Sequence, residues 1–89
     1  MPFAHFTDPR FWQLYKALPV AIRNQADKQF KLLQANPSHP SLQFKPNPSR
    51  PGLWAVRVSL DYRALAVRGK DGLQWFWIGP HAEYNRLIR

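Results

Sequence analysis

Five of the nine prolines fall within residues 37–51, and this cluster separates a helix-forming part of the chain from a strand-forming part. Each proline lacks the backbone N–H that a sheet ladder requires, so residues 37–51 cannot form a central strand. We expect an ordered connection there, in which residues 42–45 could form a short edge strand. The long helices are therefore expected before this connection and the central strands after it.

Two amphipathic helices are predicted before the proline cluster. Asp8 can accept hydrogen bonds from the first turn of a helix, and Pro9 suits the first helical position. Pro19 starts a second helix, which ends at Asn36 because the residue before Pro37 disfavours the helical region. Apolar side chains recur at helical spacing along both segments: Phe11, Leu14, Tyr15 and Leu18, then Ile22, Ala26, Phe30 and Leu33.

Strand signals dominate the chain after the cluster. Residues 70–72, Lys-Asp-Gly, form a turn signal between the last two strand candidates. The predicted elements, with one more short strand at the N-terminus, are strands at residues 3–6, 53–59, 62–68 and 73–78 and a helix at residues 81–88. Helices segregated to one face of an antiparallel sheet are the natural packing for this order. The predicted fold class is α+β: a helical hairpin on one face of a small antiparallel sheet, with a short C-terminal helix.

The turn between the predicted strands at residues 53–59 and 62–68 decides which side chains share a face. A three-residue loop over residues 59–61 places Arg57 opposite Arg63 on one face, whereas a two-residue loop places them on opposite faces. We expect the longer loop, because aspartate tolerates the left-handed conformation that such a loop often needs. Leu65 and Val67 then share a face with the arginines, and no helix of the chain is expected to cover that face. A partner is predicted to cover it.

Length and composition exclude several classes of protein. With 89 residues, of which 45% are apolar, the chain can form one small domain with its own core. The absence of cysteine excludes disulfides, a thiolate nucleophile and cysteine-based zinc sites, which fits a reducing cytoplasm. No apolar run approaches the ~20 residues needed to cross a bilayer. We therefore expect a soluble cytoplasmic protein with no membrane partner.

The net charge of +8 indicates the chemistry of the partner. Such an excess of lysine and arginine is typical of proteins that bind nucleic acid or an acidic protein. The half of the chain that contains the strands, residues 45–89, carries eight basic and three acidic side chains, so the excess is larger there.

A histidine, a carboxylate and a tyrosine follow the last predicted strand. His81, Glu83 and Tyr84, together with Arg57 and Arg63, are groups that could perform acid–base chemistry on a phosphodiester. Each could instead be structural: a solvated strand arginine, a helix cap or a packed aromatic ring. A Gly-rich phosphate loop, paired catalytic carboxylates and a serine-nucleophile motif are all missing, which excludes nucleotide-dependent chemistry.

The order of these features resembles the RelE/ParE toxin superfamily, over about residues 6–88 and therefore as a single toxin domain spanning residues 1–89. The segments that carry the resemblance follow the helical hairpin in this order: Leu42-Gln43-Phe44-Lys45, Trp54-Ala55-Val56-Arg57-Val58, Asp61-Tyr62-Arg63-Ala64-Leu65 and Ile78-Gly79-Pro80-His81-Ala82-Glu83-Tyr84. Members are small basic toxins of bacterial type II toxin–antitoxin pairs. The RelE-type branch cuts mRNA in the ribosomal A site without metal, whereas the ParE-type branch inhibits DNA gyrase.

The resemblance assigns roles to four positions. Arg63 matches the phosphate-binding arginine, Arg57 the basic position of the preceding strand, His81 a histidine of some nucleases, and Tyr84 an aromatic that stacks on a base or moves a proton. The implied catalytic residues are thus Arg57, Arg63, His81 and Tyr84, and the implied RNA-binding residues are Lys45, Arg57, Arg63 and Arg86. The resemblance implies no cofactor and no metal ligands. His5 and His39 are isolated in the sequence and are not expected to bind metal.

The favoured function is therefore that of a RelE-type endoribonuclease, an mRNA interferase that acts through 2′-hydroxyl attack without metal. Its expected partners are mRNA, the ribosome and an acidic antitoxin that is disordered alone and folds over the second face of the sheet. The predicted strand at residues 53–59 has Ala55 and Val56 where ribosome-dependent nucleases often carry lysines. A gyrase inhibitor, or a decayed toxin that only binds its antitoxin, are the alternatives.

Overall fold

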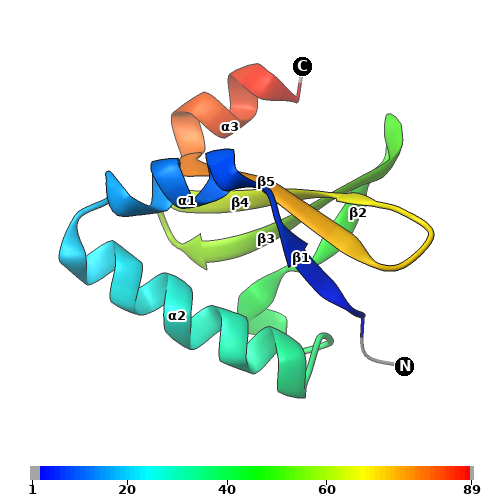
Figure 1. The fold of residues 1–89 in the computed structure, drawn as a ribbon, viewed down its shortest axis with the longest axis horizontal. Coiled ribbons are helices and arrows are strands. Elements are labelled where there is room, and N and C mark those ends of the chain that lie inside the picture. The colour runs from blue at the N-terminus through cyan, green and yellow to red at the C-terminus, as the bar shows by residue number, and fades with distance from the viewer. Residues whose placement is uncertain (1–2, 89) are drawn as a thin grey trace.

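A computed structural model describes residues 3–88, which form one five-stranded sheet and three α-helices (Figure 1). The elements in chain order are β1 (His5–Thr7), α1 (Pro9–Lys16), α2 (Val20–Ala35), the 3-10 turn η1 (Pro40–Leu42), β2 (Lys45–Asn47), β3 (Arg50–Ser59), β4 (Tyr62–Arg68), β5 (Leu73–Pro80) and α3 (His81–Leu87). The strands lie side by side in the order β1-β5-β4-β3-β2. None of the helices in residues 3–88 is long and apolar enough to span a bilayer.

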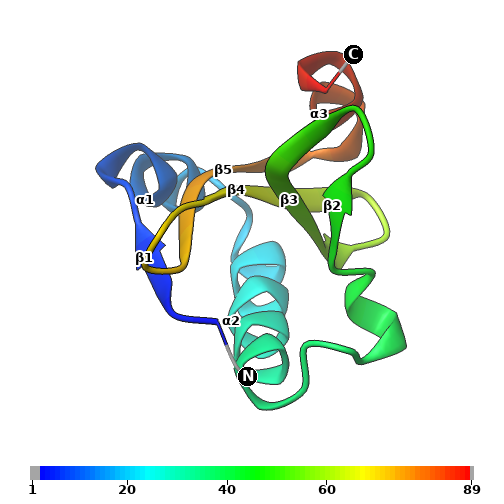
Figure 2. The ribbon, with the colours of Figure 1, turned by 90° about the vertical axis from the view of Figure 1, so that its right-hand side faces the viewer.

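The helices cover the two faces of the sheet unequally. In Figures 1 and 2, α1 and α2 lie against one face and α3 lies on the opposite side, at one end of the sheet. The predicted α+β class and the helical hairpin on one face are confirmed. The sheet is mixed rather than purely antiparallel, because β1 runs parallel to β5. Gly72, with φ +147°, permits this approach, since a Cβ there would collide with the carbonyl group of Ala4.

The helix boundaries follow from local chemistry. The Asp8 side chain accepts a hydrogen bond of 2.8 Å from the backbone N–H of Arg10, and Pro9 occupies the first position of α1, as the sequence predicted. Pro19 immediately precedes α2, which ends at Ala35 before the extended residue Asn36. Along both helices, the face with apolar side chains packs against the sheet.

Two predictions about the proline cluster are wrong. Residues 42–45 are not a strand: Leu42 ends η1, Gln43 is left-handed with φ 45°, and the edge strand β2 begins only at Lys45. The inner strand β3 also begins earlier than expected and contains Pro51. This proline is tolerated because the pairing of β3 with β4 begins at Leu53, so Pro51 lies beyond that ladder.

The main core lies between the helices and the sheet, and a smaller one lies on the other face. Val56 and Ala64 face the helices and are buried, as the sequence predicted. Leu65 projects to the opposite face, yet only 2% of its surface is exposed, whereas Val67 on the same face is 48% exposed. The expectation that this face lacks a cover of its own is therefore wrong in part, because Leu65 is buried by the chain itself and α3 contacts β4 and β5.

We predict that Leu65→Ala lowers the free energy of unfolding by about 2–5 kcal/mol, the range for truncating a buried leucine. Val67→Ala is the matched control on the same strand and face. It should cost no more than about 1 kcal/mol, because its side chain is half exposed. Urea denaturation of the two variants measures both values, and equal losses would contradict the burial of Leu65 by the chain itself.

Candidate active site

The centre of the candidate site is a row of three residues across the sheet. Arg57 on β3 lies opposite Arg63 on β4, which lies opposite Gly79 on β5. Directly opposite residues project to the same face, so the two arginine side chains are neighbours. A Cβ at residue 79 would lie 2.6 Å from Cζ2 of Trp77. Glycine at this position therefore lets the indole ring lie against β5 beside the arginines.

A bulge in β3 produces this register. Ser59 pairs with Tyr62, so the β3–β4 turn has two residues rather than the three expected from the sequence. The pairing then shifts by one residue between Ser59 and Arg57, and the extra residue in β3 brings Arg57 opposite Arg63. The predicted pairing of the arginines is confirmed, and the predicted loop length is wrong because the bulge supplies the additional residue.

The two arginines differ in what they contact. Nη1 of Arg63 donates hydrogen bonds to three carbonyl oxygens of the turn: Ser59 at 2.7 Å, Leu60 at 3.3 Å and Tyr62 at 2.9 Å. Within residues 3–88, the guanidinium group of Arg57 makes no hydrogen bond. Burial, and then the charge of Arg57, lower the pKa of Arg63. An anion bound between the two arginines would relieve this repulsion.

His81 and Tyr84 lie beside the arginine pair at the start of α3. The backbone N–H of His81 donates a hydrogen bond of 2.7 Å to the carbonyl oxygen of Asp61, which ties α3 to the β3–β4 turn. The rings of His81 and Tyr84 stack, with centroids 5.5 Å apart and planes 24° apart. Gly79, two residues before His81, lies opposite Arg63, so α3 begins beside the arginine pair. Against the effects of burial and Arg57, the charge of Tyr84 when ionised raises the pKa of Arg63. The four residues predicted as catalytic are thus brought together.

The two remaining predicted RNA-binding residues lie farther out. Lys45 on β2 pairs with Ala55, two residues before Arg57, so it lies on the same face one row away. Arg86 lies in the last turn of α3 with a 70% exposed side chain, 4.0 Å from Glu83. Among the described residues, no contact joins Arg86 to the arginine pair, and its role in binding stays a prediction.

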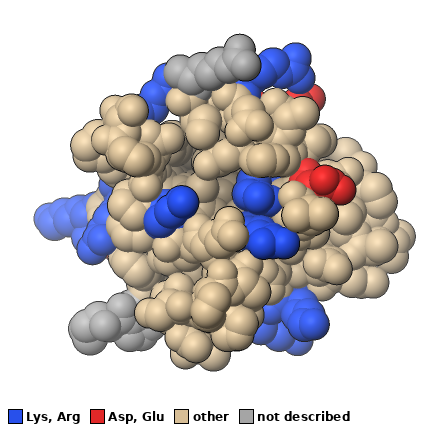
Figure 3. Space-filling model, turned by 180° about the vertical axis from the view of Figure 1, so that it is seen from behind, with Lys and Arg blue, Asp and Glu red and all other residues tan. Residues whose placement is uncertain are grey.

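Basic side chains also dominate the surface on this side of the molecule. Figure 3 shows the molecule from behind the view of Figure 1: Lys and Arg lie at the centre of this face and at several places along its outline, whereas Asp and Glu form only two small patches, right of the centre and near the top. An anion approaching from this side meets positive potential before it reaches the sheet.

A hollow of about 480 Å³ lies beside Arg57, between α2, η1 and the end of β3. It is lined in part by His39 and Ser41, whose side chains lie 2.9 Å apart. The sequence did not indicate this grouping, because the residues lie far from Arg57 along the chain. The one available signal was His39-Pro40-Ser41, a pattern in which His39 caps a short helical turn.

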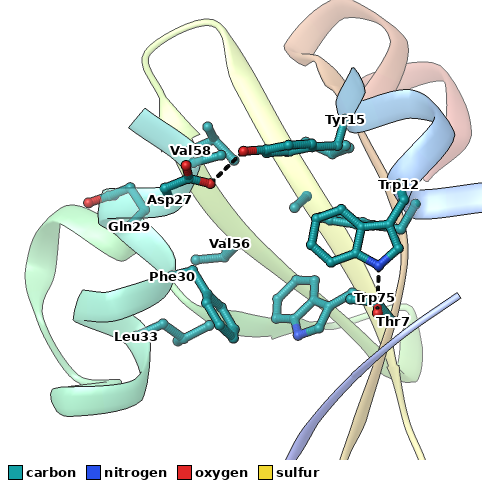
Figure 4. A pocket seen from close by; sticks show the side chains of 14 residues that line it. Thr7, Trp12, Tyr15, Asp27, Gln29, Phe30, Leu33, Val56, Val58 and Trp75 are labelled. Atoms are coloured by element: carbon teal, nitrogen blue, oxygen red, sulfur yellow. Dashed lines mark hydrogen bonds between the residues drawn. The ribbon is translucent and has the colours of Figure 1, made fainter. Parts of the chain in front are cut away.

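The opposite face holds a small apolar cavity of about 120 Å³ between α1, α2 and the sheet. Figure 4 shows two hydrogen bonds at its rim: Trp12 Nε1 to Thr7 at 2.9 Å and the Tyr15 hydroxyl to Asp27 at 2.7 Å. Its lining is almost wholly apolar, so it has no groups to hold a phosphate. The structure offers no group of three His, Cys, Asp or Glu side chains placed to hold a metal ion within the part of the chain it describes.

Comparisons with known proteins identify a family and a shared fold. The family model of the ParE-like toxin domain matches residues 20–86. None of the curated protein sequences matches the chain significantly.

Several solved structures share the fold. RelE of the RelB–RelE antitoxin–toxin complex from Methanococcus jannaschii is 14% identical, with 94% of this chain and 99% of that chain covered and a TM-score of 0.72. YafQ from Escherichia coli BL21(DE3) is 17% identical, with 92% and 97% covered and a TM-score of 0.70. A chain of the RelBE2 toxin–antitoxin complex of Mycobacterium tuberculosis is 17% identical, with 91% and 100% covered and a TM-score of 0.68.

We predict that Arg63→Ala destabilises the protein by about 1–3 kcal/mol, because the turn loses its charged hydrogen-bond donor. Arg57→Ala should leave the free energy of unfolding unchanged or slightly higher, because it removes a like charge and no hydrogen bond. Urea denaturation of the two variants tests this difference. If Arg57→Ala lowers the free energy of unfolding as much as Arg63→Ala does, the hydrogen bonds from Arg63 to the turn are not the cause of the difference.

Proposed function

This chain belongs to the ParE-like toxin domain family, and we propose that it is the toxin of a type II toxin–antitoxin pair that cleaves mRNA on the ribosome and so inhibits translation. The family match agrees with the RelE/ParE resemblance of the sequence. Solved structures with the same fold are RelE, YafQ and YoeB toxins, which favours the RelE-type branch. The ribosome and mRNA place the proposed activity in the cytoplasm.

The observation that carries the proposal is the arginine pair with His81 and Tyr84 beside it. RNA can be cleaved without metal when its 2′-hydroxyl oxygen attacks the adjacent phosphorus. A base takes the 2′ proton, the O2′–P bond forms as the P–O5′ bond breaks, and an acid protonates the departing 5′ oxygen. The products are a 2′,3′-cyclic phosphate and a free 5′-hydroxyl group.

Each role has a chemically suitable residue. Arg57 has a guanidinium group that makes no hydrogen bond to any residue from 3 to 88, and its planar fork can hold two oxygens of the crowded phosphorane and neutralise the charge that develops there. Arg63 adds a second positive charge and keeps the turn closed. His81 and Tyr84 are the proton-transfer pair, because an imidazole ring and a phenol hydroxyl group can each donate or accept a proton.

The proposed protein partner is an acidic antitoxin. The net charge of +8 and the two neighbouring arginines on this face of the sheet attract negatively charged side chains. In the Methanococcus jannaschii structure, RelE is bound to the antitoxin RelB. Leu65 cannot be an apolar contact of such an antitoxin, because it is already buried.

We predict that the purified protein lowers protein synthesis in a cell-free extract and leaves mRNA with new, codon-phased ends. Arg57→Ala and His81→Ala should each slow cleavage at least about tenfold, because each removes a charge-stabilising or proton-transferring group. Lys70→Gln is the control: it removes one positive charge in the exposed β4–β5 turn, and it should cleave mRNA like the parent. Primer extension on the recovered mRNA measures the ends.

Inhibition of DNA gyrase is the second candidate, because the matching family model is ParE-like and β3 carries Ala55 and Val56 in place of lysines. A supercoiling assay separates the two functions. Blocked gyrase with intact mRNA would contradict the nuclease and support the inhibitor. If the folded protein binds its antitoxin but neither inhibits gyrase nor cleaves mRNA, it is a decayed toxin.

A further inference from the structure

The edge of β3 is uncovered next to the arginine pair. The pairing of β2 with β3 reaches only Ala55, so among residues 3–88 no strand lies beside the edge of β3 from Arg57 to Ser59. The hollow of about 480 Å³ lies along this edge, and Arg57 belongs both to its lining and to the arginine pair. The hollow therefore continues the candidate active site rather than forming a separate one.

Gln29 on α2 keeps the hollow in shape. Its side-chain Nε2 donates a hydrogen bond of 2.9 Å to the carbonyl oxygen of Arg57 and lies 3.5 Å from the carbonyl oxygen of Ser41. One amide thus links α2 to the exposed edge of β3 and to η1. Because this hydrogen bond occupies the carbonyl oxygen of Arg57, that oxygen repels an anion in the hollow less than an unbonded oxygen would.

The tautomer of His39 follows from its contacts. The backbone N–H of Ser41 donates a hydrogen bond of 3.1 Å to Nδ1 of His39, and the Ser41 hydroxyl group lies 2.9 Å from the same atom. Because an amide N–H can only donate, Nδ1 is unprotonated. The neutral ring therefore carries its proton on Nε2, which is a hydrogen-bond donor.

The charges around the hollow favour an anion. Lys28 on α2 and Arg57 on β3 both line it, and no acidic side chain does so among the described residues. Lys28 therefore brings one positive charge and His39 a neutral donor, while the charge of Arg57 lies at the border between the hollow and the arginine pair. This set suits a phosphate, which prefers charged donors and does not require an apolar pocket.

We propose that this hollow is a second phosphate subsite, which holds a backbone phosphate of single-stranded RNA neighbouring the one held between Arg57 and Arg63. The inference rests on the proposed function in taking RNA as the ligand. Lys28 supplies charge, His39 donates from Nε2, and Arg57 lies between the two phosphates. The RNA backbone would then cross the strands from β5 over β4, pass the arginine pair, and continue over the edge of β3 towards α2.

Two variants test the subsite. Lys28→Gln removes the charge from an exposed helix position. His39→Asn removes the Nε2 donor but keeps a side-chain acceptor that can cap η1, since asparagine is itself a good capping residue. Lys70→Gln is the matched control, with the same loss of charge at the exposed β4–β5 turn. Equal urea midpoints for the variants and the parent establish that they are folded.

The probes are 2′-O-methyl RNA oligonucleotides, a trinucleotide and a nonanucleotide, which cannot be cleaved because the attacking hydroxyl group is blocked. Fluorescence anisotropy gives their affinities across a range of salt. For the nonanucleotide, Lys28→Gln should reduce the slope of log K against log [salt] by about 0.7, the value for one phosphate contact on a single strand. His39→Asn should weaken binding about two- to tenfold with little change in slope, as expected for one neutral hydrogen bond. The trinucleotide should respond less to both.

Three results would overturn the subsite: equal effects of Lys28→Gln and Lys70→Gln, equal losses for the two oligonucleotides, or a Lys28→Gln variant that loses affinity only for the antitoxin. A parent protein that binds neither oligonucleotide would overturn the subsite together with the nuclease. If the parent binds RNA as predicted but leaves mRNA intact in the translation extract, the nuclease fails and the subsite is supported.

Discussion

The pairing of β3 with β4 determines which side chains face the helices and which face outward. Side chains alternate along a strand, so a slip of β3 by one residue against β4 would turn Val56 out of the core and Arg57 into it. Burying an unpaired guanidinium group costs far more than burying valine contributes. The bulge in β3 keeps the favourable register while a two-residue turn closes the hairpin. Core and candidate site therefore depend on the same local irregularity.

The corner where β3, β4 and α3 meet combines stability with chemistry. Arg63 holds the carbonyl oxygens of the turn, and the same turn holds the first residue of α3 through Asp61. His81 is thus fixed relative to the arginine pair by backbone hydrogen bonds rather than by its own side chain. Arg57, with no bond from its guanidinium group within residues 3–88, keeps its donors for a ligand. The two arginines are equivalent in sequence pattern but differ in physical role.

Much of the fold and of the site could be predicted because the signals are local. Asp8 and Pro9 favour the start of a helix through contacts within its first turn. Apolar residues at alternate positions of β3 and β4 identify the buried face of the sheet. The pairing of Arg57 with Arg63 was also predictable, although through the wrong loop length. The edge strand was misplaced because Gln43 adopts a left-handed backbone that no nearby residue type signals. The partial cover of the second face was missed because α3 contacts β4 and β5 from the end of the chain.

The sequence by itself determined the segmentation into helices and strands, the positive charge, and the residue types available for chemistry on a phosphate. These depend on propensity, prolines and composition, which act over a few residues. The tertiary structure alone decided that α3 covers part of the second face and that Gln29, His39 and Arg57 surround one hollow. Gln29 and Arg57 are 28 positions apart, and their contact requires α2 and β3 to pack together. Such long-range contacts exist only when the whole core has formed, so no local pattern encodes them.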